Sequence, residues 1–228
     1  TLSLKVNGLA VRTGRGRTLL QMNALSVPAG SMIGVRGPSG AGKSTLLYAL
    51  AGLLDVVDGD VLWGDADLYA MSAAGRASFR AERMGMIFQD FLLFEELGAG
   101  GNAGISAMFR PASERAALRA RSDGYLRALG LDASAARPAS SYSGGERQRI
   151  AVARALANDA SILLADEPTA SLHREAADRL IDDLCGLVRE TGRTLVAVSH
   201  DPVLIERMDR VLTIENGGVT NDTHRDPA

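Results

Sequence analysis

The residues best suited to chemistry form the run GPSGAGKS, which begins at Gly37. This run fits the phosphate-binding pattern GxxxxGK[ST], in which glycines let successive backbone N–H groups converge on phosphate oxygens at a helix start. Lys43 would neutralise the β- and γ-phosphates, and the Ser44 hydroxyl would reach Mg²⁺. The pattern therefore predicts nucleotide binding by Gly37, Pro38, Ser39, Gly40, Ala41, Gly42, Lys43, Ser44 and Thr45.

A second motif, SILLADEP at 161–168, ends an apolar run in two acids. A buried strand would deliver Asp166 to the carboxyl edge of a sheet, where such folds bind ligands and where this carboxylate would hold Mg²⁺ through water. Glu167 would then orient the attacking water as a general base. An acidic pair alone is more often a solvated turn, but a phosphate loop in the same chain favours the catalytic interpretation.

The elements that must position these residues alternate between strand and helix. Apolar runs bounded by turn residues predict strands, and helical spacing of apolar residues predicts helices. The strands are expected at 2–11, 19–27, 31–37, 162–166, 194–200 and 210–217, and the helices at 43–54 and 174–190. The first two strands should form an antiparallel edge. The order otherwise predicts an α/β fold with a mostly parallel sheet.

Strand signals are absent between about 91 and 142, where 111–131 has the character of a helix. This segment is therefore expected to be an α-helical subdomain inserted into the α/β core. The C-terminal run NDTHRDPA is polar, and we expect it to be frayed.

Composition restricts the class of protein. A chain of 228 residues with 46% hydrophobic residues can bury one large core, and a formal net charge of −2 gives no reason to expect a nucleic-acid partner. A single cysteine, Cys185, allows no internal disulfide and suits a reducing compartment such as the cytosol. Because no apolar run reaches about 18 residues, the chain is not expected to span a membrane.

A third motif, SYSGGERQRIAVARAL at 141–156, resembles the signature of ABC ATPases, which is usually LSGGQ. Ser143 and Glu146 fit a capping box, and two glycines between them leave backbone N–H groups bare at the start of a helix. The resemblance implies that this motif grips the γ-phosphate of ATP bound to the opposite subunit. It therefore implies a head-to-tail pair, either a homodimer or a pair with a paralogous ATPase, with Ser143, Gly144, Gly145 and Glu146 in the site.

Two further residues match the ABC pattern. Gln89, in GMIFQDF, resembles the glutamine that senses Mg²⁺, and His200, in VAVSHDP, resembles the histidine that contacts the γ-phosphate. A lone histidine at a strand end is more often structural, but five motifs in the family's order favour the catalytic role. The resemblance implies one ABC ATPase domain over 1–228, with a core of 1–90 and 157–228 and a helical subdomain of 91–156.

Two segments depart from the family. The aromatic residue that usually stacks on adenine is missing near Thr13, so Val11 or Arg12 is expected to contact the base, with weaker base discrimination. The run 95–109 keeps Asn102 but carries glycines at 98, 100, 101 and 104, which weaken a helix. The resemblance places this run beside the face that receives a permease's coupling helix, and we expect it to be mobile when no partner is bound.

A third departure is His173, where the family commonly has the aspartate that caps the next helix. Histidine is a weaker cap, and its charged form is disfavoured at the positive end of a helix. We therefore expect a neutral imidazole at the subunit interface.

These resemblances predict an ATP- and Mg²⁺-dependent ATPase subunit that drives a separate integral-membrane permease from the inner face of the membrane. The group expected is that of lipoprotein release, macrolide export and cell division. Two alternatives remain: the ATPase of a small-solute importer, and a soluble ABC ATPase such as one in iron–sulfur assembly. The transported substrate never touches this chain, so the sequence does not identify it.

Overall fold

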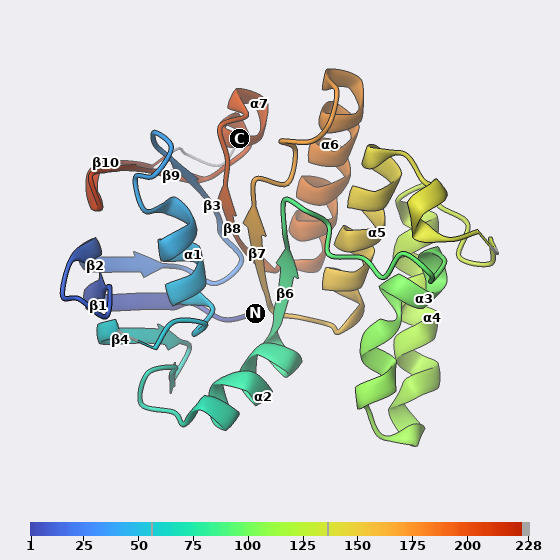
Figure 1. Cartoon of the computed structure of the whole chain (residues 1–228), viewed down its shortest axis with the longest axis horizontal. Helices are drawn as coiled ribbons and strands as arrows, with labels where there is room; N and C mark the ends of the chain where they lie inside the picture. The colour runs from blue at the N-terminus through green and yellow to red at the C-terminus, as the bar shows by residue number, and fades with distance from the viewer. Residues whose placement is uncertain (56, 136, 225–228) are drawn as a thin grey trace.

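The computed structural model describes residues 1–55, 57–135 and 137–224 (Figure 1). Its described strands form one sheet in the order β5-β4-β1-β2-β10-β9-β3-β8-β7-β6. The sheet is parallel from β9 through β3, β8 and β7 to β6, and β1, β2, β4 and β5 pair antiparallel at the other end. The strands are β1 (Leu4–Arg12), β2 (Thr18–Val27), β3 (Met32–Arg36), β4 (Val57–Trp63), β5 (Ala66–Asp67), β6 (Met84–Ile87), β7 (Ile162–Asp166), β8 (Thr194–Val198), β9 (Arg210–Glu215) and β10 (Gly218–His224).

The parallel strands are buried on both faces, because side chains of a strand alternate between the faces of a sheet. In β7, Ile162 and Leu164 join the core on the side of α1 (Lys43–Leu50), whereas Leu163 and Ala165 join the core on the other side. The second core is covered by α5 (Gly144–Ala157) and α6 (Arg174–Thr191), which lie beside the sheet in Figure 1. The expected α/β fold with a mostly parallel sheet and an antiparallel edge is confirmed.

Helices also dominate the segment where strand signals are absent. It contains α3 (Ala99–Ala103), the 3-10 helix η1 (Ile105–Phe109), α4 (Ala112–Ala128), the 3-10 helix η2 (Ala139–Ser141) and α5. The first four gather on the far side of α5 from the sheet (Figure 1). Among the described helices, none has the length and apolar character needed to cross a bilayer.

The glycine-containing run forms a helix in spite of its composition. A Cβ at Gly100 would lie 2.6 Å from the backbone oxygen of Ala133, so only glycine lets α3 approach that segment. The Asn102 side chain is fully buried, accepts a hydrogen bond from the Phe94 amide at 2.8 Å and donates to the Leu97 carbonyl at 3.0 Å. Tertiary packing thus stabilises a helix that local propensity disfavours.

Several boundaries differ from those expected. The first helix ends at Leu50 rather than 54, because the chain turns at Gly52, whose φ is 63°. Residues 221–224 are not frayed but belong to β10, which pairs with β9, while 225–228 lie outside the described residues. Three strands, β4, β5 and β6, and two helices, α2 (Ala73–Arg83) and α7 (Pro202–Glu206), were not among the elements that the sequence predicted.

Candidate functional site

The phosphate loop joins β3 to α1 and turns through left-handed backbone conformations. The φ angles are 152° at Gly37, 75° at Gly40 and 106° at Gly42, a region that favours glycine. A Cβ at Gly37 would lie 2.0 Å from the Ile214 backbone oxygen, so a side chain cannot be accommodated there. The glycines therefore allow the loop to curl against β9 and present its amides at the start of α1.

The Lys43 side chain folds back over this loop and is only 7% exposed. Its Nζ donates hydrogen bonds to the backbone oxygens of Gly37 at 2.9 Å and Pro38 at 3.0 Å. The Lys43 ammonium is thus fixed against the loop. This arrangement suits a polyanion such as a phosphate chain.

Asp166 ends β7 beside α1 and is 7% exposed. Its Oδ1 accepts a hydrogen bond from Ser44 Oγ at 3.1 Å, and its Oδ2 accepts one from Tyr48 Oη at 3.0 Å. Burial and the adjacent Asp166 carboxylate raise the pKa of Tyr48, so its hydroxyl stays protonated as a donor. The role of Tyr48 was missed from the sequence, although its position four residues after Ser44 puts both side chains on one helix face.

The oxygens of Ser44 and Asp166 are hard donors close enough to share a cation. Mg²⁺ in nucleotide sites typically takes one or two carboxylates together with phosphate oxygens and waters, so these residues fit that ion. The described residues contain no group of three or more His, Cys, Asp and Glu side chains that could hold a metal by themselves. The phosphates would therefore have to complete the coordination.

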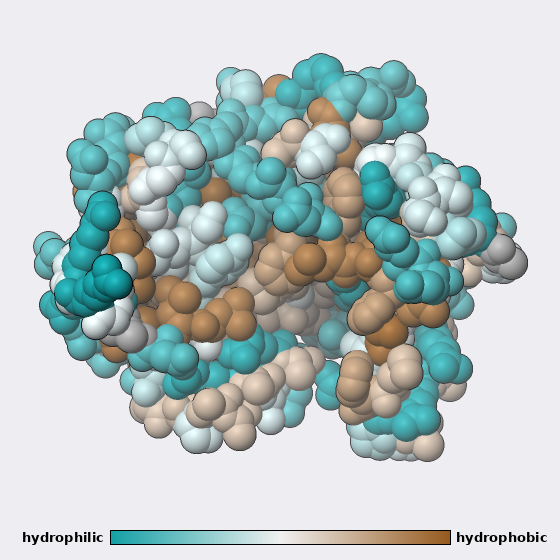
Figure 2. All heavy atoms as spheres, viewed as in Figure 1, coloured by the Kyte–Doolittle hydropathy of each residue, from teal (hydrophilic) through white to brown (hydrophobic). Residues whose placement is uncertain are grey.

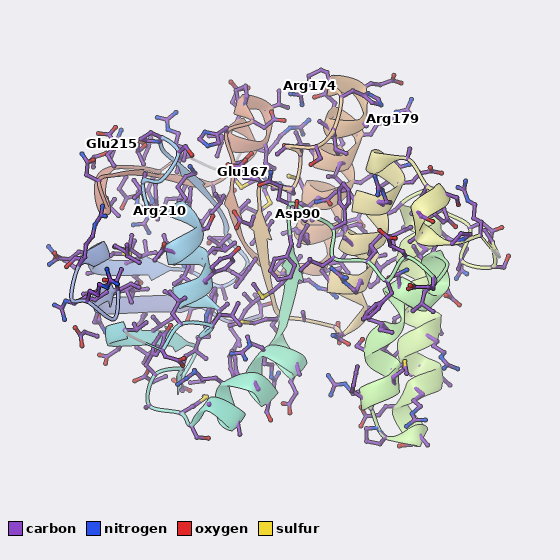
Figure 3. The ribbon with its side chains drawn as sticks, viewed as in Figure 1. Asp90, Glu167, Arg174, Arg179, Arg210 and Glu215 are labelled. Carbon is purple, nitrogen blue, oxygen red and sulfur yellow. The ribbon has the colours of Figure 1, made fainter. Side chains whose placement is uncertain are left out.

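Glu167 lies at the end of β7, near the middle of the view in Figure 3. Its φ of 46° is unusual for a residue with a side chain, and its amide donates to the Val198 carbonyl at 2.9 Å. The His200 amide donates to Glu167 Oε2 at 3.1 Å, and His200 Nε2 lies 3.3 Å from Oε1. The carboxylate is thus fixed at the ends of two adjacent parallel strands, β7 and β8.

A cavity of about 640 Å³ brings most of the predicted residues together. The cavity lies at the carboxyl ends of the parallel strands, the edge of the sheet where α/β folds bind ligands. Its lining includes Ser39, Gly40, Gly42, Lys43, Ser44, Thr45, Gln89, Asp166, Glu167 and His200. Gly37 and Pro38 line an adjoining pocket, and Ala41 is buried within the loop.

Gln89 enters this cavity from the segment after β6, which helix α5 holds in a strained shape. Phe91 and Leu92 have φ angles of 58° and 49°, unusual for two consecutive residues with side chains. Arg154 of α5 donates to both of their carbonyls, at 2.9 Å to Phe91. The signature helix therefore fixes the backbone that follows Gln89.

The signature motif begins α5 with the predicted capping box. Ser143 Oγ accepts from the Glu146 amide at 3.3 Å, and Glu146 Oε2 accepts from the Ser143 amide at 2.8 Å. Arg137 donates to the other Glu146 oxygen at 2.7 Å, and its guanidinium lies 3.7 Å from the centre of the Tyr142 ring. Tyr142, which occupies the usual leucine position, is almost wholly buried.

The signature does not share the phosphate-loop cavity. Ser143 and Gly145 line a separate cavity of about 170 Å³ together with Arg149, His173 and Arg179. Neither Gly144 nor Glu146 lines it. A Cβ at Gly145 would lie 3.1 Å from the Ala176 Cβ, so the glycine lets α5 pack closely on the start of α6. One chain therefore carries two separate halves of the predicted nucleotide site.

His173 caps α6 through its imidazole. Its Nδ1 accepts a hydrogen bond from the Ala176 amide at 3.4 Å, which is longer than a typical hydrogen bond from a backbone amide. A ring nitrogen that accepts a hydrogen bond carries no proton, so this cap requires Nδ1 to be unprotonated.

The residues expected to contact a base are poorly placed for it. Val11 is only 3% exposed, and Arg12 is paired with Asp58. Leu19 of β2 is instead 37% exposed and lines the phosphate-loop cavity beside Gly42. Sequence reasoning missed Leu19, because its contact depends on how β2 lies against the loop.

Comparisons with known proteins agree on one family. The family model described as ABC transporter matches residues 20–170. The chain is 39% identical over 217 residues to an uncharacterized ABC transporter ATP-binding protein, YbbA of Escherichia coli K12, covering 94% of this chain and 95% of that protein. It is 37% identical over 200 residues to the lipoprotein-releasing system ATP-binding protein LolD of Hyphomonas neptunium, covering 87% of each.

A solved structure extends this similarity to the fold. The dimeric post-hydrolysis state of the ATP-binding cassette MJ0796, bound to ADP and Pi, aligns with a TM-score of 0.86 at 28% identity. The alignment covers 99% of this chain and 100% of that one.

Proposed function

Since the chain belongs to the ABC transporter family, we propose that it is the ATP-hydrolysing subunit of a transporter that exports or mechanically releases its substrate through a separate membrane permease. Proteins of this family bind and hydrolyse ATP, and this chain is such an ATPase. The observation that carries the proposal is the 640 Å³ cavity, because it gathers a phosphate loop, a buried carboxylate and a Glu–His pair at one sheet edge.

In this proposal the loop from Gly37 to Thr45 holds the phosphates of ATP. Lys43 exchanges its hydrogen bonds to the loop carbonyls for contacts with the β- and γ-phosphates. Ser44, Gln89 and Asp166 would hold Mg²⁺, which would neutralise charge on the transferred phosphoryl group. The Ser44–Asp166 contact and the position of Gln89 in the same cavity support this assignment.

Glu167 orients and polarises the attacking water, since its carboxylate opens on the same cavity as Lys43. His200 keeps that carboxylate in place with its amide and contributes an imidazole to the γ-phosphate end of the cavity. Gln89 links this end to the strained segment held by Arg154.

The second half of each site comes from a partner chain. Ser143, Gly144, Gly145 and Glu146 lie outside the phosphate-loop cavity, so a head-to-tail pair is needed to bring a signature motif to each bound ATP. The dimeric state of the solved ABC cassette supports this arrangement. The partner is a second copy or a paralogous ATPase.

We assign the core to 1–90 and 157–228, and the helical subdomain to 91–156. The permease would dock on four exposed apolar side chains of the segment between β6 and α4, which we call the apolar patch: Leu92, Phe94, Met108 and Phe109, with exposed fractions of 57%, 55%, 64% and 85%. Apolar surface crosses the middle of the molecule over the segment between β6 and α3 (Figure 2). Docking there would place the chain at the inner face of the membrane. Movement of the permease would then be transmitted to Gln89 through the segment between β6 and α3.

The similarity to LolD makes a permease of the lipoprotein-release type the first candidate, and an importer permease is the alternative, because the chain is equally similar to the import protein MetN. The test is copurification of the tagged chain with an integral-membrane protein from detergent extracts. The double change Phe94→Ser and Phe109→Ser should abolish copurification but keep basal ATPase activity. A matched control is Leu53→Ser, because Leu53 is 43% exposed and lies outside the patch.

Transport is supported if the wild type and Leu53→Ser copurify with a stable membrane partner and the double variant does not. A purely soluble assembly in wild-type extracts would refute the transporter assignment and favour a soluble ABC ATPase.

A further inference from the structure

The Asp166 carboxylate receives two hydroxyl donors from one face of α1. Ser44 and Tyr48 are four residues apart, so their side chains lie one above the other on the helix surface. Ser44 Oγ donates to Oδ1 at 3.1 Å, and Tyr48 Oη donates to Oδ2 at 3.0 Å. Each carboxylate oxygen is therefore assigned to a different donor.

These two contacts leave lone pairs free on Ser44 Oγ and on Asp166 Oδ1. A serine hydroxyl has one proton and two lone pairs, so Ser44 can donate to Asp166 and still face a cation. Oδ1 can likewise accept from Ser44 and from a water on that cation. Oδ2 is turned toward the phenol, away from Ser44. The Tyr48 ring packs against the core on the α1 side of the sheet, which fixes where its hydroxyl lies.

We propose that Tyr48 is a positioning residue for the metal site: its hydroxyl stops the Asp166 carboxylate from turning and keeps Oδ1 directed at Mg²⁺. This inference rests on the proposed function, because it takes Ser44 and Asp166 as the metal site. Tyr48 does not line the phosphate-loop cavity, so in this proposal it acts only through Asp166. Loss of such a supporting contact typically lowers metal affinity by about 10- to 100-fold.

The test is a binding measurement on the full chain, with a nucleotide that cannot be hydrolysed. Mn²⁺ is titrated into the protein with AMP-PNP, and free Mn²⁺ is followed by electron paramagnetic resonance. Tyr48→Phe should weaken Mn²⁺ binding by about 10-fold. Nucleotide binding measured in EDTA should not change, because the phosphate loop is intact.

Tyr69→Phe is the matched control. Tyr69 is also part-buried, and its hydroxyl donates to the Ala49 carbonyl of the same helix at 2.9 Å, but it does not contact Asp166. Mn²⁺ affinity should therefore stay at the wild-type value. Equal weakening in both variants would mean that any loosening of α1 disturbs the site, and it would overturn the inference.

Asp166→Asn separates the inference from the proposal on which it rests. If Asp166→Asn weakens Mn²⁺ binding and Tyr48→Phe does not, the positioning role of Tyr48 is refuted but the metal site stands. If Asp166→Asn has no effect either, the assignment of the metal site itself is wrong.

Discussion

The cap of helix α6 provides a quantitative test of the unusual His173. Its imidazole accepts the Ala176 amide at 3.4 Å, whereas Asn, Asp and Ser are the preferred residues at this position of a helix. Replacing a good cap by alanine costs about 1 kcal/mol, so replacing a weak cap by a good one should recover part of that difference, up to about 1 kcal/mol. For a domain of this size, about 1 kcal/mol corresponds to a rise in Tm of about 2–4 °C.

The variants His173→Asn, His173→Asp and His173→Ala separate the contribution of the capping hydrogen bond from that of a negative charge. Asn adds the cap alone, and Asp adds a negative charge near the positive helix end, worth about 0.3–1 kcal/mol more. Arg149 and Arg179 line the same cavity and favour that charge, while Glu175 opposes it.

Urea unfolding followed by circular dichroism should therefore rank the chains, from most to least stable, as His173→Asp, His173→Asn, wild type and His173→Ala. The Hill coefficient of ATP hydrolysis should also differ among these chains. If all four chains unfold at the same urea concentration and show the same cooperativity, the imidazole is not a weak cap and has no part in communication between the two sites.

Two further outcomes are expected. ATP and GTP should compete nearly equally for the cavity, because Leu19 offers a base an apolar contact without a base-specific hydrogen bond; a large preference for ATP in competition binding would contradict this. Burial raises the pKa of Glu146, but hydrogen bonds from Ser143 and Arg137 outweigh it and hold the pKa below its usual range. The wild type should therefore exceed Glu146→Gln in stability at neutral pH by up to about 1 kcal/mol. This difference should shrink as the pH falls below about 4.3, the ordinary pKa of glutamate, and it should be lost once the pH is below the lowered pKa of the folded chain. A pH-independent difference in chemical unfolding would exclude this carboxylate as its source.

The phosphate loop and the two acids could be predicted because each is a contiguous motif whose neighbours also define its strand or helix. Tyr48 and Leu19 could not, because their importance depends on tertiary placement. Tyr48 matters only once α1 lies against β7, and Leu19 only once β2 lies against the phosphate loop.

Local composition was misleading where pairing or packing dominates. The polar run at 221–224 forms part of β10 because β9 supplies its backbone partners and Arg210 donates to Asp222 at 2.7 Å. The glycines near Asn102 weaken a helix in isolation, yet α3 forms because Gly100 permits a close approach to Ala133. In both cases the stabilising partner lies outside the run itself, in strand β9 for residues 221–224 and at Ala133 for α3.

The assignment of Glu167 is tested most directly by trapping the ATP-bound state. Glu167→Gln should abolish ATP hydrolysis, because an amide cannot act as the base, and it should form an ATP-dependent dimer in size-exclusion chromatography with light scattering. Glu190→Gln is the control, since Glu190 is exposed at the end of α6, and this variant should hydrolyse ATP as the wild type does. Retained hydrolysis by a Glu167→Gln chain that stays monomeric with ATP would contradict the proposed mechanism.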